Sequence, residues 1–191
     1  MGHLMENLLV LQLAKNNLSA VSTHWFSNLN KLLYENQLTS VPEDIFQNLP
    51  NLKEIGLHGN KIAELSPNLF PHKDKLNKLL LENNLLTGLP EGFFVGFPQL
   101  KTLTLQKNKL TSLPPVLDAD LFEKLASVVT LRLAHNDLHT LPEDIFDPLL
   151  KLKKLYLSDN PWRCDCNLIP LHLWIKANSD KIQSAAVLKP H

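Results

Sequence analysis

The two cysteines, Cys164 and Cys166, are the residues best suited to chemistry, and both stand in one short stretch, NPWRCDCNL, residues 160–168. His172 follows closely, so a metal site or a redox pair is one interpretation. Zinc sites use four ligands, however, and the chain has no second pair of cysteines. A disulfide between the two would be strained by its short loop. We therefore expect two thiols without partners, no metal site and no cofactor.

A second set with chemical capacity comprises His135, Ser158 and Asp159. These residue types can act as the base, the nucleophile and the orienting group of a hydrolase. Catalysis would also need donors for an oxyanion and a pocket that excludes water, and the sequence supplies neither. We therefore expect no enzymatic activity, with His135 and Asp159 forming a surface charge pair beside Lys107.

An internal repeat must position these residues. The template LxxLxLxxNxL fits six segments, which begin at residues 8, 52, 76, 100, 128 and 152. A seventh copy, ending at Leu38, fits only in its second half. The repeated asparagines are Asn16, Asn36, Asn60, Asn84, Asn108, Asn136 and Asn160. Their commonest spacing is 24 residues, a period typical of a solenoid.

The alternation xLxLx within each copy predicts a short strand whose leucines face one way and whose other residues face the opposite way. Parallel strands of successive copies then stack into one sheet. Each asparagine follows the point where its strand turns, and its amide can bond backbone groups of neighbouring turns that would otherwise be buried unpaired. This accounts for asparagine, rather than leucine, at a buried position.

The opposite wall is predicted from segments such as VPEDIF at 41, LPEGFF at 89 and LPEDIF at 141. Proline and acidic residues suit the first turn of a short helical segment. The phenylalanines expected to stack inside this wall are Phe26, Phe46, Phe70, Phe94, Phe122 and Phe146. Strands pack about 4.8 Å apart and the bulkier wall needs more room, so the stack should curve with its sheet inside.

The pattern resembles that of leucine-rich repeat proteins, in particular the 24-residue repeat of their extracellular members. The resemblance implies an α/β solenoid, a horseshoe with a concave parallel β-sheet and a short α-helical C-terminal cap. NPWRCDCNLIPLHLWIK is similar to the start of the family's cysteine-rich cap, N-P-W-x-C-x-C followed by a helix. In that family the two cysteines pair with two more downstream, and this sequence has neither.

The cap is expected to hold by packing alone. Pro170 can begin a helix, and Trp162 would fill the join to the last repeat. The residues that recur at helical spacing are Leu168, Leu171, Trp174 and Ile175. We expect about seven repeats over residues 1–159 and a truncated cap over 160–191. The first repeat starts by Leu8 without the family's N-terminal cap, so we expect a fragment or variant that can self-associate through incompletely capped ends.

Two copies depart from the template. Four residues are missing near 27–35, so Lys31 takes the place of an inward leucine and this rung should be irregular. Four extra residues near 114–121 predict a bulge on the outer wall, which is more simply loop variation than a functional insertion.

The outward strand residues form columns along the predicted sheet. The central column runs Gln12, Leu32, Gly56, Leu80, Thr104, Arg132 and Tyr156, and its neighbour runs Ala14, Tyr34, His58, Glu82, Gln106, Ala134 and Ser158. Aromatic residues and arginine carry much of the energy of protein interfaces. The candidate ligand contacts are therefore Tyr34, His58, Glu82, Gln106, Arg132 and Tyr156. The alternative is an ordinary solvated sheet face.

Charge and composition exclude several classes of partner. Lys and Arg number 19, as do Asp and Glu, so no field of one sign favours nucleic acid. No stretch approaches the roughly 18 to 20 apolar residues of a membrane span. The start of the chain lacks the features of a signal peptide, whereas the cap motif favours a secreted or extracellular protein. Asn17, in the sequon with Leu18 and Ser19, can carry a glycan there.

The expected function is binding of another protein on the concave face without chemistry, as the family resemblance implies. One alternative is an innate-immunity receptor segment that recognises microbial lipid or glycan. It requires an apolar pocket, for which Leu32, Leu80 and Tyr34 are the hints. Another alternative is an intracellular scaffold, which the missing signal sequence favours and the cap motif opposes.

Overall fold

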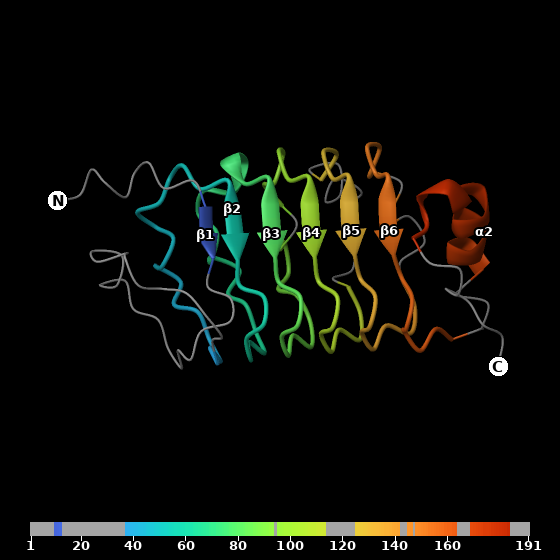
Figure 1. Cartoon of the computed structure of the whole chain (residues 1–191), viewed down its shortest axis with the longest axis horizontal. Helices are drawn as coiled ribbons and strands as arrows, with labels where there is room; N and C mark the ends of the chain where they lie inside the picture. Colours follow the sequence, from blue (N-terminus) through green and yellow to red (C-terminus); the bar gives the residue numbers. More distant parts are fainter. Residues whose placement is uncertain are drawn as a thin grey trace.

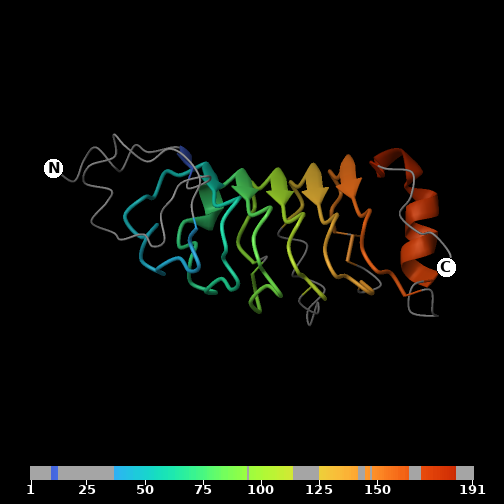
Figure 2. The ribbon, with the colours of Figure 1, turned by 60° about the horizontal axis from the view of Figure 1, so that its bottom comes forward.

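The computed structural model describes residues 10–12, 37–93, 95–113, 125–141, 145–146, 148–163 and 169–183. Within them the chain forms one parallel sheet of six short strands in chain order, seen side by side in Figure 1. The strands are β1 (Val10–Gln12), β2 (Glu54–Gly56), β3 (Lys78–Leu80), β4 (Thr102–Thr104), β5 (Thr130–Arg132) and β6 (Lys154–Tyr156). Figure 2 shows the sheet on one side of the stack and the connecting segments on the other.

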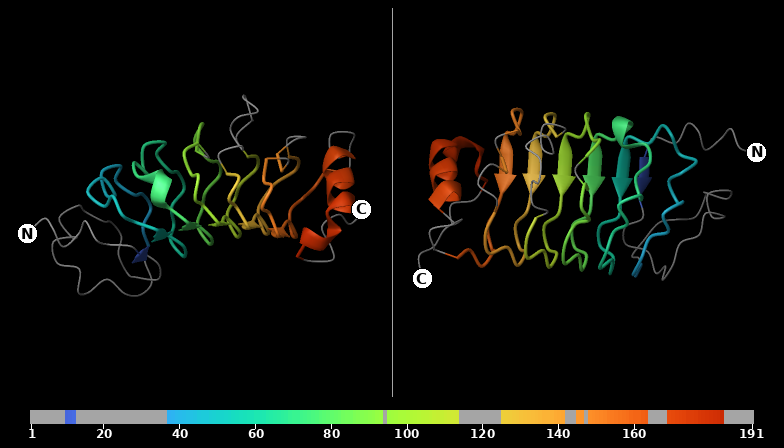
Figure 3. Two further views of the ribbon diagram at one scale, coloured as in Figure 1. Left: turned by 90° about the horizontal axis from the view of Figure 1, so that it is seen from above. Right: turned by 180° about the vertical axis from the view of Figure 1, so that it is seen from behind.

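Equivalent residues of successive repeats lie beside each other in the sheet. Leu79 of β3, for example, pairs with Ile55 of β2 and with Leu103 of β4. These central residues are buried, because alternate strand side chains point to opposite faces and the central one faces the core. The strands line the inner side of a shallow arc (Figure 3, left). The predicted α/β solenoid with a concave parallel sheet is confirmed.

A second row of leucines follows the strands and completes the core. They are Leu57, Leu81, Leu105, Leu133 and Leu157, and each is fully buried. Burial of one leucine side chain contributes about 2 kcal/mol. Each turn from β2 to β6 adds such a leucine and one inward Leu or Ile from its strand, so a turn is stabilised mainly by the turns next to it.

In the described part of the chain, the outer wall is filled by phenylalanines, as expected. Phe46 stacks on Phe70 with ring centroids 5.7 Å apart. Phe70 next meets Phe93 and Phe97 edge-on, at 6.2 Å and 6.1 Å. Phe94, like Phe26 and Phe122, lies outside the described residues. The sequence analysis did not select Phe93 or Phe97, because neither occupies the repeated position.

The outer-wall segments that begin at Pro42 and Pro90 form successive turns instead of the predicted short helix. In the segment at 42–49, Ile45 N–H donates to the Pro42 carbonyl and Leu49 N–H donates to the Phe46 carbonyl. Each bond spans three residues, as in a single turn of 3₁₀ helix. The segments are too short for the four-residue bonds of an α-helix to accumulate, so the prediction of a helix was wrong here.

Lys73 lies across the outer wall, at the start of the 3₁₀ turn η3 (Lys73–Lys75). Its ammonium donates to the Val95 carbonyl at 3.1 Å and lies 5.3 Å from the centre of the Phe97 ring. Gly96 has φ +90°, and a Cβ added there would come within 3.4 Å of the Lys73 side chain. Desolvation in this position lowers the pKa of Lys73 below its ordinary value.

At the N-terminal end, the order of the sheet corrects the predicted central column. The predicted column placed Leu32 between Gln12 and Gly56, whereas Gln12 of β1 pairs directly with Gly56 of β2. Leu32 itself lies outside the described residues. The copy that ends at Leu38 nevertheless joins the stack, because Lys61 N–H donates to the Leu38 carbonyl at 2.8 Å. The first copy therefore supplies the strand beside β2, whereas the second copy supplies the turn that follows.

The C-terminal end is covered by helix α2 (Ile169–Ala177), as predicted from its apolar spacing. Leu171 is buried against the last repeat, and the Trp174 ring lies 4.8 Å from that of Phe146. After the 3₁₀ turn η5 (Ser179–Lys181), Ile182 pairs with Leu155 at the edge of β6. Cys164 and Cys166 lie outside the described residues. No helix in the described part of the chain is long and apolar enough to span a membrane.

Candidate protein-binding face

The candidate site is the open face of the sheet, which we call the sheet face. We define it by the outward residues of β2 to β6 and of the two positions after each strand. Its central column is Gly56, Leu80, Thr104, Arg132 and Tyr156, and the next column is His58, Glu82, Gln106, Ala134 and Ser158. Gly56, Thr104 and Ala134 are buried, whereas the other side chains of these two columns are half-buried and can take part in recognition.

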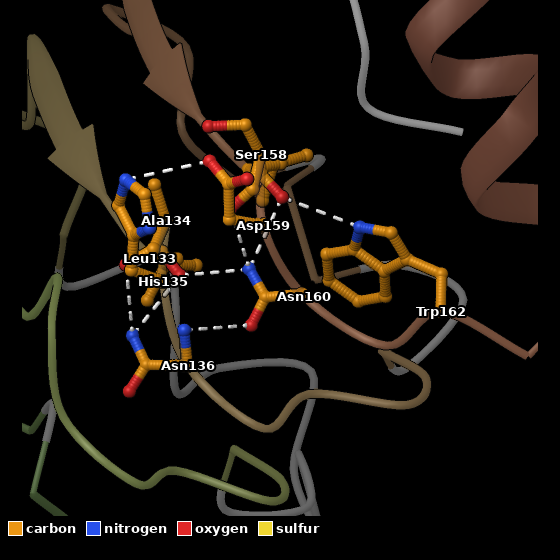
Figure 4. Close-up of polar contacts among 9 residues, drawn as sticks. Leu133, Ala134, His135, Asn136, Ser158, Asp159, Asn160 and Trp162 are labelled. Atoms are coloured by element: carbon orange, nitrogen blue, oxygen red, sulfur yellow. Dashed lines mark hydrogen bonds and ion pairs between the residues drawn. The ribbon is translucent and has the colours of Figure 1, made fainter. Parts of the chain in front are cut away.

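The repeated asparagines fix the edge of this face. Asn84 donates to the carbonyl of Leu81 in its own turn at 3.1 Å and to that of Leu57 in the preceding turn at 3.0 Å. Its Oδ1 accepts from Ile62 N–H at 3.2 Å. Figure 4 shows the same arrangement at the last two turns, around Asn136 and Asn160. One amide thus satisfies backbone groups of two turns, and the turns cannot slide past each other without breaking these bonds.

Five of the seven asparagines lie in the described part of the chain. Asn60, Asn84, Asn108 and Asn136 are buried, and Asn160 is half-buried beside the cap. There the Trp162 indole N–H donates to the Leu157 carbonyl at 3.2 Å, a bond visible in Figure 4. Asn16 and Asn36 lie outside the described residues.

The residue before each asparagine has a left-handed backbone, which turns the chain away from the sheet at the same point in every repeat. These residues are Gly59, Asn83, Lys107, His135 and Asp159, with φ between 54° and 68°. Glycine and asparagine tolerate this conformation, whereas a lysine or histidine is strained there. Three of them, Lys107, His135 and Asp159, also bring a charged or titratable side chain to the margin of the sheet face.

Polar side chains on the part of the sheet face from β2 to β4 are only partly satisfied by the fold. Thr104 Oγ1 donates to the Glu82 carboxylate across neighbouring strands. Glu54 and Lys78 form an ion pair at 3.5 Å. His58 Nδ1 and Gln106 Oε1, by contrast, are buried without a hydrogen-bond partner. A buried polar atom left unpaired costs about 1–3 kcal/mol, so these two atoms mark places where the fold has not optimised its own stability.

Arg132 and Tyr156 form the most anchored contact on the C-terminal half. The guanidinium carbon of Arg132 lies 4.7 Å from the centre of the Tyr156 ring on the next strand. The strand register brings them together, because Arg132 and Tyr156 are paired residues of β5 and β6. Both side chains are half-buried, so the stacked pair is held in place while part of its surface remains accessible.

The three residues considered for catalysis do not form a catalytic arrangement. His135 Nε2 lies 3.3 Å from the Asp159 carboxylate, as expected for a charge pair, and both side chains are more than half exposed. Ser158 enters this network through its main-chain carbonyl, which accepts from His135 N–H at 2.9 Å. Figure 4 shows the His135 imidazole directed at Asp159, and the exposure of both side chains leaves the pair open to water.

The structure places five of the six candidate contact residues on this face. His58, Glu82 and Gln106 follow one another in one column, whereas Arg132 and Tyr156 occupy the adjacent central column. Tyr34 and the sequon residue Asn17 lie outside the described residues. Sequence reasoning named Lys107 but passed over Lys101, Lys153 and Lys154, three further exposed lysines in and around the last three strands. Summing the charge strand by strand would have revealed them.

Comparison with known proteins identifies the repeat. Residues 33–86, 74–117 and 115–161 each match the family described as leucine rich repeat, and together they cover more than half of the chain. The chain is a leucine-rich repeat protein. Its ladder of asparagines and its in-register strands are therefore the framework of a leucine-rich repeat solenoid, and the sheet face is the inner surface of that solenoid.

Several curated relatives share part of this leucine-rich repeat region. The platelet glycoprotein Ib beta chain of Rattus norvegicus is 41% identical over 51 residues, which is 27% of this chain and 25% of the relative. Platelet glycoprotein IX of Homo sapiens is 46% identical over 46 residues, or 24% of this chain and 26% of the relative. Immunoglobulin superfamily member 10 of Mus musculus is 38% identical over 60 residues, 31% of this chain but 2% of the relative. The matched segments span about a quarter or less of these relatives.

In the described part of the leucine-rich repeat chain, no three His, Cys, Asp or Glu side chains gather closely enough to hold a metal ion.

Proposed function

We propose that this leucine-rich repeat chain is a non-enzymatic module that binds another protein on its sheet face. The observation that carries the proposal is the half-buried Arg132, whose guanidinium lies over the Tyr156 ring of the next strand. His58 Nδ1 and Gln106 Oε1 also have no hydrogen-bond partner, but both atoms are buried, so they would bind a ligand only after their side chains turn outward. Anchored aromatic and arginine side chains with accessible surface are the usual centres of protein interfaces.

The binding site is proposed to include His58, Glu82, Gln106, Arg132 and Tyr156, with Tyr34 as a further contact. The proposal that the chain works outside the cell rests on its NPWRCDC motif and on its similarity to two proteins named as platelet glycoproteins. A glycan on Asn17 is part of the same proposal, because sequons are used on proteins that pass through the secretory route.

The small volume of the void in the core favours protein binding over recognition of a lipid. The apolar void bounded by Leu113, Leu125 and Phe146 measures about 10 Å³ and lies in the core behind β4 and β5. Such a volume admits at most about one water molecule, so an acyl chain cannot enter it without separating the repeats. The outward Leu80 stands between Gly56 and Thr104 in the central column and offers one apolar side chain, not an apolar groove.

Capture from plasma tests the proposed function. Immobilised wild type should retain one or more plasma proteins that an Arg132→Ala and Tyr156→Ala double variant releases, because the double variant removes the anchored contact without touching the core. A matched control is Lys109→Ala, since Lys109 is exposed and follows the ladder asparagine, where the chain has turned away from the sheet. Equal capture by the double variant and the wild type would place the binding site elsewhere.

Self-association is a separate proposal and concerns the N-terminal end. The C-terminal end is covered, because α2 packs on the last repeat and Gln183 N–H donates to the Leu155 carbonyl at 2.9 Å. We expect a concentration-dependent dimer through the β1 end in sedimentation velocity. A single monomeric species at high protein concentration would contradict this expectation.

A further inference from the structure

The sheet face is electrically uneven although the chain as a whole has a formal net charge of zero. Residues 53–59 and 77–83, which contain β2 and β3, carry two lysines and two glutamates. Residues 101–107, 129–135 and 153–159, which contain β4 to β6, carry five lysines and arginines but one aspartate. The positive charge is therefore concentrated over β4 to β6, where Arg132 and Lys154 lie on the sheet face and Lys101, Lys107 and Lys153 lie at its margins. We call this part the basic half of the sheet face.

The few carboxylates on the sheet face are already engaged. Glu54 pairs with Lys78 and Glu82 accepts from Thr104, both on the N-terminal half. On the basic half, Asp159 pairs with His135 at 3.3 Å. Among the described residues, the Arg132 guanidinium therefore forms no ion pair with a carboxylate, and its side chain contacts the Tyr156 ring.

Arg132 is also prepared to receive a ligand. Stacking on Tyr156 restrains a long side chain that would otherwise lose conformational entropy on binding. The stacked guanidinium keeps its N–H groups in one plane, so its edge can bind a carboxylate through two parallel hydrogen bonds. The neighbouring column changes here from Gln106 to the small Ala134 and Ser158, so Arg132 and Tyr156 are flanked by shorter side chains.

We propose that the basic half of the sheet face binds an acidic segment of a partner protein, with an Asp or Glu carboxylate of that segment on the Arg132 guanidinium. Lys107 and Lys154 are exposed on either side of the central column that holds Arg132 and Tyr156. Their charges add electrostatic attraction for the neighbouring acidic residues of the partner segment. This proposal rests on the proposed function and adds to it the chemistry of the partner.

Selection from a library of short random peptides displayed on phage tests the proposal at physiological salt. The wild type should enrich peptides rich in Asp and Glu, and Lys109→Gln should enrich the same peptides. Arg132→Gln should lose this enrichment while keeping the melting temperature of the wild type, because Arg132 lies outside the core. An enriched peptide made synthetically should bind Arg132→Gln about 10- to 100-fold more weakly in fluorescence anisotropy, the effect of losing a charge-assisted hydrogen-bonded pair.

Arg132→Lys separates the shape of the guanidinium from its charge. It retains the positive charge but not the planar pair of donors, so it should restore part of the affinity that Arg132→Gln loses. Binding of the peptide should also weaken as salt is raised, since exposed charges are screened. Affinity that neither substitution changes would overturn the proposal.

Three other results would also overturn it, and they separate it from the proposed function. Enrichment of apolar peptides whose binding is blocked by Leu80→Arg would support the sheet face as a binding site but contradict the acidic partner. Enrichment of peptides whose binding is unchanged by both Leu80→Arg and Arg132→Gln would contradict the sheet face as well. Binding of heparin that depends on Arg132, with no acidic peptide enriched, would replace the proposed protein segment by a sulfated polysaccharide.

Discussion

Asn108→Ala is the substitution that probes the asparagine ladder most directly, because Asn108 lies in the middle of the stack. Its Oδ1 accepts from Leu86 N–H at 3.1 Å, and its Nδ2 donates to the carbonyls of Leu81 and Leu105, each at 3.0 Å. The side chain is buried, so water cannot replace these bonds in the folded state. Alanine removes all three bonds while leaving the backbone able to keep its conformation.

The three lost bonds are not equivalent. Leu81 O also accepts from Asn84, and Leu105 O also accepts from Asn136, so each carbonyl keeps one partner. Each of these losses should cost about 0.5–1.5 kcal/mol. The N–H of the fully buried Leu86 is left unpaired, which costs about 1–3 kcal/mol more. The free energy of unfolding should therefore fall by roughly 2–6 kcal/mol, a large part of the total for a single domain.

Urea unfolding followed by circular dichroism measures this loss, with Asn68→Ala as the matched control. Asn68 is exposed, so its substitution should change the free energy of unfolding by less than about 0.5 kcal/mol. Asn108→Asp keeps an acceptor for Leu86 but sets a carboxylate against two carbonyls, so at neutral pH it should lose at least as much as alanine. A loss below about 1 kcal/mol for Asn108→Ala would refute the argument that buried backbone groups depend on the ladder.

Three further predictions concern the turn, the outer wall and the cap. Lys107→Gly should raise the free energy of unfolding by about 1 kcal/mol, since glycine relieves left-handed strain at φ 55°, and a lower melting temperature would contradict this. Burial lowers the pKa of Lys73, so between that pKa and the ordinary 10.5 the unfolded chain binds more protons than the folded chain. The free energy of unfolding of the wild type should therefore rise, relative to that of Lys73→Met, as the pH rises through this window. A difference between the two that stays constant with pH in urea titrations would contradict this prediction. Leu171→Ala should lower the free energy of unfolding by about 2–4 kcal/mol, because Leu171 is buried. Leu173→Ala should change it little, because Leu173 is exposed. Equal effects of the two substitutions in thermal unfolding would mean that α2 does not pack on the last repeat as described.

The parts of the fold that repeat were predictable because one physical reason acts at every copy. Leucine at alternate positions predicts an inward row, and the structure buries Leu79, Leu103 and Leu131 accordingly. The spacing of Leu171 and Trp174 likewise predicts the apolar side of α2. The outer wall was less predictable, since Phe93 and Phe97 enter the core at positions outside the repeat. Which ring fills a space there depends on the backbone turn around it, and that turn has no periodic signal.

The candidate site was only partly predictable for a related reason. Alternation shows that His58, Arg132 and Tyr156 face outward, but outward residues need no partner and carry no further pattern. The stacking of Arg132 on Tyr156 depends on side-chain rotamers, and the isolation of Gln106 Oε1 depends on which neighbours reach it. Neither can be read from a single strand.

The sequence by itself determined the repeat length, the parallel sheet, the ladder positions and the apolar side of the cap helix, because each follows from a local period or from the chemistry of a single side chain. Only the tertiary structure decided that β1 pairs directly with β2, that the Leu-Pro segments are turns, and that Arg132 is held by Tyr156 without a carboxylate among the described residues. These outcomes depend on which chain segments and side chains compete for the same space. That competition is settled only when the turns of the solenoid are packed against each other.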